Sequence, residues 1–256
     1  MEDKIKEYYS KFEEIYTEEN YPEWFKFVQS YNRYKGYGEE GYNKNESGHK
    51  LGHYAILQTQ IHEENKILIV GNNNSWFVPG NMKRSLEVVR GLQQGIPEEN
   101  FYTKGESDFA KDLNRYFASN GSKAKNIFDN NTVGLNRLWL QTGPQCPPEE
   151  LAEAKKSNIL LKYEWTDLQK KCKDWTKEII EIVSPKLLLL LGGEAKKLYP
   201  EEGYWKGFWI QHCPAPSFTR FKQKLSPEFY EFSSLAELTQ YKEKKIRNGL
   251  EMAKLI

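Results

Sequence analysis

Two polar stretches of the sequence follow apolar runs and could carry chemistry. Residues 72–77, NNNSWF, come directly after the largely apolar run 66–71, KILIVG. A short amide at the end of a strand can hold a water molecule or read the edge of a nucleobase. His212 precedes the proline-rich turn 213–217, which holds its imidazole at the mouth of a loop. An asparagine tract is also a common turn, and a lone histidine is often structural, so each stretch alone leaves both interpretations open.

Other kinds of site have little support in the sequence. The three cysteines, Cys146, Cys172 and Cys213, are far apart and not in CxxC spacing, which argues against disulfides or a zinc cluster. His49 and His53 have HxxxH spacing, but the flanking glycines disfavour the helix that would bring them together. The chain has neither GxGxxG nor GK[ST], so nucleoside triphosphate chemistry is not indicated. We expect no metal and no cofactor.

Composition sets the class of protein. With 256 residues, 38% hydrophobic and 14% aromatic, the chain can fill a core, and 37 basic against 36 acidic residues neither require nor exclude a nucleic-acid partner. The first residues are charged throughout, and the longest apolar run, 182–191, is interrupted by Ser184 and Pro185. We therefore expect a cytoplasmic protein with no membrane role, and nothing indicates an obligate protein partner.

Strands and helices alternate along the chain, which predicts an α/β fold with a mostly parallel central sheet and helices on both faces. In such sheets ligands bind outside the carboxyl ends of the strands, so the loops after residue 71, near residue 136 and after residue 211 are the candidate sites. The pattern predicts two helices within 1–35, a flexible arm at 36–52, strands at 66–71, 132–138, 186–191 and 208–211, helices at 82–94, 107–119, 167–183 and 235–254, and a turn at 141–148.

Four segments together resemble motifs of the uracil-DNA glycosylase superfamily, over residues 66–225. They are ILIVGNNNS (67–75), TVGLNRLW (132–139), LLLLLGGEA (187–195) and HCPAPS (212–217), and they follow one another in the family's order. The resemblance implies a three-layer αβα sandwich, with N-terminal helices and an arm at 1–52 and the glycosylase-like domain at 53–256. In motif character the chain is most similar to the mismatch-type branch, which also uses an asparagine.

The resemblance also implies roles for individual residues. Asn73 falls where the family orients the attacking water, and His212 falls on the histidine that stabilises negative charge on the departing base. Asn136 matches the amide that bonds the Watson–Crick edge of the base, and Phe77 or Trp76 would stack on it. The implied activity is that of a monofunctional DNA glycosylase; a catalytically inactive nucleic-acid-binding protein and a nucleoside or nucleotide hydrolase are the alternatives.

The chain departs from the family pattern at three points. Asn74 replaces the usual proline, Cys213 stands between His212 and Pro214, and the four iron–sulfur cysteines of one branch are absent. DNA is the expected partner, because basic and aromatic residues that can hold phosphates and fill the gap left by a flipped base lie beside the motifs. They are Lys83, Arg84, Phe218, Arg220 and Lys222, and Ser217 beside them is a further DNA-contacting candidate.

The first prediction concerns the size of the base. Ser75 lies two residues after the water-orienting position, where the uracil-selective branch carries a bulky tyrosine that blocks C5 substituents. Without that wall the enzyme accepts C5-substituted pyrimidines, because exclusion requires a clash. Excision of uracil, thymine and C5-enlarged cytosines is compared for the native chain and Ser75→Tyr. Native activity on uracil alone, or large-base activity that survives Ser75→Tyr, would contradict the prediction; Trp76 or Phe77 replacing the wall is the alternative.

Overall fold

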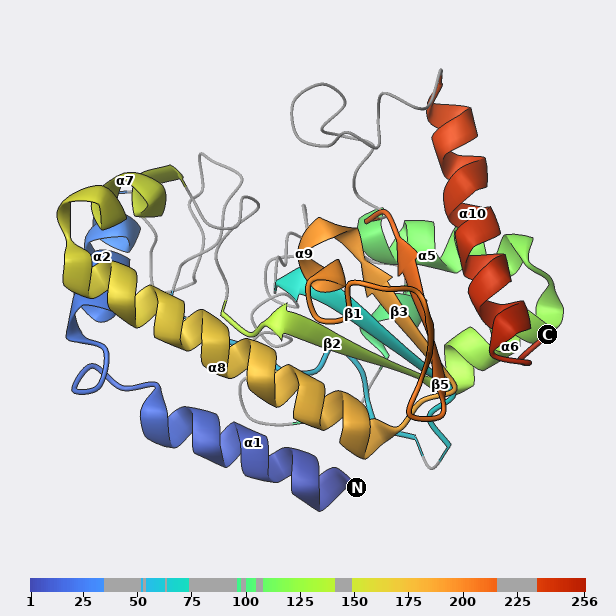
Figure 1. The fold of residues 1–256 in the computed structure, drawn as a ribbon, viewed down its shortest axis with the longest axis horizontal. Helices are drawn as coiled ribbons and strands as arrows, with labels where there is room; N and C mark the ends of the chain where they lie inside the picture. The colour runs from blue at the N-terminus through green and yellow to red at the C-terminus, as the bar shows by residue number, and fades with distance from the viewer. Residues whose placement is uncertain are drawn as a thin grey trace. The chain divides into compact units, whose positions relative to one another are not determined.

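The described strands form one five-stranded sheet in the order β2-β1-β3-β5-β4 (Figure 1). The computed structural model describes residues 1–34, 52, 54–62, 64–73, 96–97, 100–104, 108–140, 149–215 and 234–256. The strands are β1 (Ile67–Asn73), β2 (Thr132–Leu138), β3 (Leu187–Leu191), β4 (Gly203–Trp205) and β5 (Phe208–Cys213). The protein is therefore of the α/β class, as the alternation of strands and helices predicts.

The sheet is parallel except at its β4 edge. β1 pairs with β3 and β3 with β5 in parallel, while β4 and β5 form an antiparallel hairpin. Near the starts of the strands, the amides of Lys66 and Ile67 donate to Asn131 O, the amides of Lys186 and Leu187 donate to Lys66 O, and that of Trp209 donates to Lys186 O. Because the strands start together, the carboxyl ends of β1, β3 and β5 meet at the opposite edge.

Apolar side chains explain why these segments are central strands. All five leucines of β3 are buried, as are Ile67 to Val70 of β1, which is the pattern of strands covered on both faces. One cluster packs these strands against α4 (Phe101–Lys104), α5 (Asp108–Ser119), α6 (Ser122–Asn130) and α10 (Leu235–Met252). The strands contribute Ile67, Ile69, Leu187, Leu189, Leu191 and Cys213. This cluster includes the stacked rings of Phe117 and Phe128, 4.4 Å apart.

The chain divides into two compact units. The helical unit comprises Met1–Leu57, Asn73–Pro97 and Asn136–Ile182, and the sheet unit comprises Gln58–Asn72, Glu98–Leu135 and Val183–Ile256. The helical unit contains α1 (Glu2–Ile15), α2 (Pro22–Tyr34), α7 (Glu149–Ser157) and most of α8 (Ile159–Val183). Within it, the amides of Glu23 and Trp24 at the start of α2 donate to the Glu164 carboxylate of α8. That contact satisfies two N–H groups that have no partner within the helix.

The longest helix differs from its predicted span. α8 begins at Ile159 and not at residue 167, because Asn158 caps it: its Oδ1 accepts the amide of Leu161 at 2.9 Å. Ile159, Leu160 and Tyr163 are exposed, so the first turns break the amphipathic pattern from which a helix is recognised. α6 was not predicted either. α5 and α10 follow the predicted helices closely.

The predicted boundaries of two strands were also wrong. β1 continues through Asn73, and β5 continues to Cys213, so His212 lies within the strand and not after it. The sequence prediction also missed the hairpin, which turns at Lys206 and Gly207 with φ of 45° and 96°.

The predicted helix at 82–94, the turn at 141–148 and all of the 36–52 arm except Gly52 lie outside the described residues. None of the described helices is both long and apolar enough to span a membrane.

The second prediction tests the packing of β2 against α4. A Cβ added to Gly134 would lie 2.5 Å from Cε2 of Tyr102, whose ring is buried. We expect Gly134→Ala to lower the free energy of unfolding by about 1–3 kcal/mol, because neither strand nor ring can give way freely. Gly193→Ala is the matched control, since its Cβ would meet no described atom within 4 Å. Urea denaturation measures both, and equal midpoints for the two variants would contradict the assigned contact.

Candidate functional site

The register of the sheet places the two predicted catalytic positions on strands that flank β3. Val70, Leu190 and His212 stand in one row across β1, β3 and β5. Asn73 lies three residues beyond Val70, at the end of β1. The chain passes from β1 to β2 on one side and then returns to β3 on the other, so the end of β1 is a topological switch point. Such points are where α/β sheets bind ligands.

The imidazole of His212 is held by a backbone carbonyl. Gln211 and Cys213 contact α10, so strand alternation directs His212 to the other face of the sheet. There its Nε2 lies 2.8 Å from Tyr199 O, in the turn after α9 (Gly192–Lys196). A carbonyl can only accept, so Nε2 carries the ring proton and donates it. Nδ1 therefore keeps the lone pair in the neutral ring.

The backbone of His212 is held by a carboxylate at the sheet edge. β4 pairs with β5 only as far as Gly203 opposite Ile210, so the short strand offers the His212 amide no partner. Oε1 of Glu202 accepts that amide at 2.9 Å and the side-chain amide of Gln211 at 2.7 Å. Lys245 of α10 donates to the same carboxylate at 2.9 Å. Glu202 thus extends the edge of the sheet by one hydrogen bond and fixes His212 in place.

The environment favours the neutral form of His212. Burial is the largest effect and lowers the pKa of the imidazole below its ordinary value of 6.5, and the charges of Lys196 and Lys245 act in the same direction. The hydrogen bond to Tyr199 O and the charge of Glu202 raise the pKa but do not outweigh the burial. His212 is consequently uncharged at neutral pH, with its proton on Nε2.

Asn136 is held rigidly within the helical unit. Its Nδ2 donates to Ala55 O at 3.2 Å, and its backbone amide donates to Ile56 O at 3.1 Å. Its backbone oxygen accepts the hydroxyl of Thr176 at 3.2 Å. Because Ala55 O can only accept, the side-chain amide has one orientation, and reversing it would bring two oxygens together. The sequence alone leaves that orientation open.

The structure describes only part of the predicted site. Asn73 ends β1, but its side chain lies outside the described residues, and Asn136 and His212 belong to different units. The base-contacting and DNA-contacting candidates also fall outside the description: Ser75, Trp76, Phe77, Lys83, Arg84, Ser217, Phe218, Arg220 and Lys222. Tyr199 and Glu202 were not predicted. The signal for Glu202 is the hairpin, because its register places residue 202 beside residue 211.

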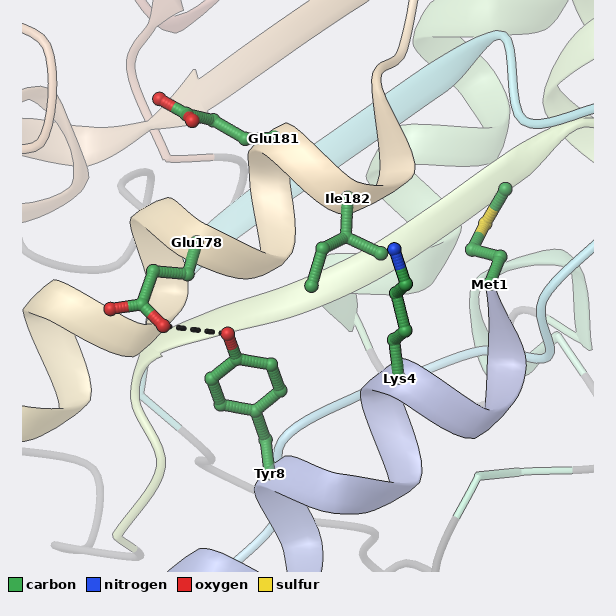
Figure 2. Close-up of a pocket in the computed structure, with 6 residues that line it drawn as sticks. All are labelled: Met1, Lys4, Tyr8, Glu178, Glu181 and Ile182. Atoms are coloured by element: carbon green, nitrogen blue, oxygen red, sulfur yellow. Dashed lines mark hydrogen bonds between the residues drawn. The ribbon is translucent and has the colours of Figure 1, made fainter.

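A surface groove in the helical unit involves none of the predicted residues (Figure 2). It is lined by side chains of α1, of the residue before it and of α8: Met1, Lys4, Tyr8, Glu178, Glu181 and Ile182. The Tyr8 hydroxyl donates to Glu178 at 2.6 Å, and burial, followed by that carboxylate, raises the pKa of Tyr8 well above its ordinary value. This bond joins the two helices, so we assign the groove a structural role.

The third prediction tests the contact between Glu202 and His212. Glu202→Ala leaves the His212 amide without a partner, and an unsatisfied buried donor costs about 1–3 kcal/mol. We expect a loss of that size in denaturation and faster hydrogen exchange at the His212 amide. Glu201→Ala is the control, because Glu201 is exposed and lies next in the chain. Unchanged exchange at His212 in the Glu202 variant would show that the carboxylate does not hold the strand.

Neither a group of metal ligands nor a known relative points to the function of these residues. In the part of the chain that the structure describes, no group of three or more His, Cys, Asp or Glu residues could hold a metal ion. No protein-family model and no curated protein matches the sequence.

Proposed function

We propose that the chain is a monofunctional DNA glycosylase with the three-layer αβα fold of the uracil-DNA glycosylase superfamily. It flips a modified or mismatched pyrimidine out of DNA and hydrolyses the N-glycosidic bond, which leaves an abasic site. The four motif segments that resemble the family support this proposal. In the structure the described parts of these segments form β1, β2, β3 with the start of α9, and the last two residues of β5 with residues 214 and 215.

One observation carries the proposal. His212 is in register with Leu190 and Val70, and Asn73 follows Val70 at the carboxyl end of β1, beside the switch point of the sheet. The carboxyl ends of parallel strands are where α/β sheets bind ligands. Gly192, with φ of 84°, has a backbone conformation that favours glycine where β3 passes into α9.

The chemistry of base excision suits such a site. The glycosidic bond breaks through a cation-like sugar, so a positioned water and preorganised polar groups near the departing base carry most of the catalysis. Asn73 can orient a water but cannot accept its proton, so we expect slower turnover than in relatives with aspartate. The small side chain of Ser75 favours a C5-substituted pyrimidine, such as thymine in a mismatch or a hydroxymethylated or glycosylated cytosine. A large modified cytosine would suit defence against foreign DNA.

The fourth prediction tests the activity and both residues. Oligonucleotides carrying uracil, thymine mismatches or C5-enlarged cytosines are incubated with the protein, and abasic sites are revealed by cleavage on a gel. We expect Asn73→Ala and His212→Ala each to lower excision by at least about tenfold, since one preorganised group is worth about 10²–10³ in rate. DNA binding by both variants stays close to that of the native chain.

Asn130→Ala and His62→Gln are the matched controls. Asn130 is exposed on α6, and His62 precedes β1 at the opposite edge of the sheet. Excision that is equal in the control and test variants would contradict the catalytic assignment. Tight DNA binding with no excision of any base would indicate the inactive nucleic-acid-binding protein. Release of bases only from free nucleosides, included as a separate reaction, would indicate the nucleoside hydrolase.

A further inference from the structure

The ring proton of His212 has a fixed position that does not fit the expected role of this residue. A histidine that stabilises charge on a departing base must present an N–H group to that base. The one ring proton of neutral His212 is already donated to Tyr199 O, at 2.8 Å from Nε2. The other ring nitrogen, Nδ1, has no hydrogen bond among the described residues, and in the neutral ring it is an acceptor. The geometry therefore favours proton acceptance over donation.

The other predicted catalytic residue cannot supply this function. Residue 73 is an asparagine, and a side-chain amide does not accept a proton from water at neutral pH. His212 is the titratable member of the pair. A buried, neutral imidazole with its tautomer fixed from behind by an acceptor is the arrangement of a general base.

From this geometry, and resting on the proposed function, we propose that His212 is the general base of the reaction: Nδ1 accepts a proton from the attacking water, while Tyr199 O holds the Nε2 proton. The water oxygen forms a bond to C1′ of the sugar, and its proton moves to Nδ1. The glycosidic C–N bond breaks, and its electron pair leaves with the base. The imidazolium then returns the proton to the base or to solvent. Nothing is oxidised or reduced.

Charged groups from three neighbouring segments set the strength of this base. Glu202, before β4, holds the His212 amide and places negative charge near the ring. Lys196 of α9 and Lys245 of α10 place positive charge near it. Burial adds to the effect of the lysines and lowers the pKa of His212, so the ring is neutral and able to accept a proton at neutral pH. Glu202 and Tyr199 are thus positioning residues, and they also favour the imidazolium formed in the reaction.

The fifth prediction separates a base from a donor by the sign of the pH dependence. A base works when neutral, so excision rises as the pH increases through the pKa of His212, below 6.5, and then levels off. A cationic donor gives the opposite slope over the same range. Single-turnover excision is measured from acid to neutral pH, and nitrogen-15 spectra of the histidine rings report the protonated nitrogen of His212, assigned with His212→Gln.

Two charge variants test whether the slope belongs to His212. Glu202→Gln removes a charge that raises the pKa, and we expect the rate midpoint and the His212 titration to move together to lower pH. Lys245→Met removes a charge that lowers the pKa, and both should move to higher pH. A general loss of structure would not shift the midpoint in opposite directions.

The outcomes distinguish this inference from the proposed function. The inference is supported by a neutral ring protonated on Nε2, a rate that rises with pH, and paired shifts in the two variants. It is overturned by a proton on Nδ1 of the neutral ring, by an excision rate that falls as the pH rises through the pKa of His212, or by a rate midpoint that is unchanged in both charge variants. A protein that keeps the Nε2 tautomer but excises no base at any pH overturns the proposed function, and the catalytic role of His212 with it.

Discussion

The parallel register of β1, β3 and β5 is the constraint on which the rest of the structure depends. Three carbonyls near the strand starts, those of Asn131, Lys66 and Lys186, bond the neighbouring chain segments and start the strands together. The leucines of β3 do not themselves specify this register, because both faces of that strand are buried and a slip of one residue would exchange leucine for leucine. The hydrogen bonds at the strand starts hold it. With the starts fixed, the length of each strand decides where it ends. β1 ends at Asn73 and β5 ends one residue after His212.

The edge of the sheet leaves one backbone amide of β5 without a partner strand. β4 is only three residues long, so the amide of His212 extends beyond its partner strand. A buried N–H without an acceptor destabilises the fold, and here the Glu202 carboxylate accepts the hydrogen bond. The ammonium of Lys245 donates to the same carboxylate and balances its charge. The same contact therefore decides both where the imidazole lies and how much negative charge it senses. A longer β4 could hold β5 equally well through backbone hydrogen bonds. It would not bring the negative charge of Glu202 near the His212 ring, which would then have only the charges of Lys196 and Lys245 beside it.

In this chain, sequence patterns predict which strands and helices exist better than they predict the residues at which these begin and end. Buried strands are visible as apolar runs, and the α/β alternation follows from them. The start of α8 is hidden because Ile159 and Leu160 are exposed, and β4 is hidden because Lys206 and Gly207 form its turn without the usual asparagine. Among the candidate residues, the order of the motifs selects His212 and Asn136. The tautomer of His212 cannot, because Tyr199 O reaches it only through the fold.

A base made this way is a compromise between availability and strength. Burial keeps the imidazole of His212 neutral at neutral pH, so nearly every molecule can accept a proton. The same lowered pKa makes each of those acceptors weaker, and proton transfer is most effective when the pKa lies near the working pH. Glu202 and Tyr199 O counter the burial by favouring the imidazolium. Because Asn73 cannot share the proton, the balance between these groups, and not the strength of any one of them, sets how fast the proposed reaction can run.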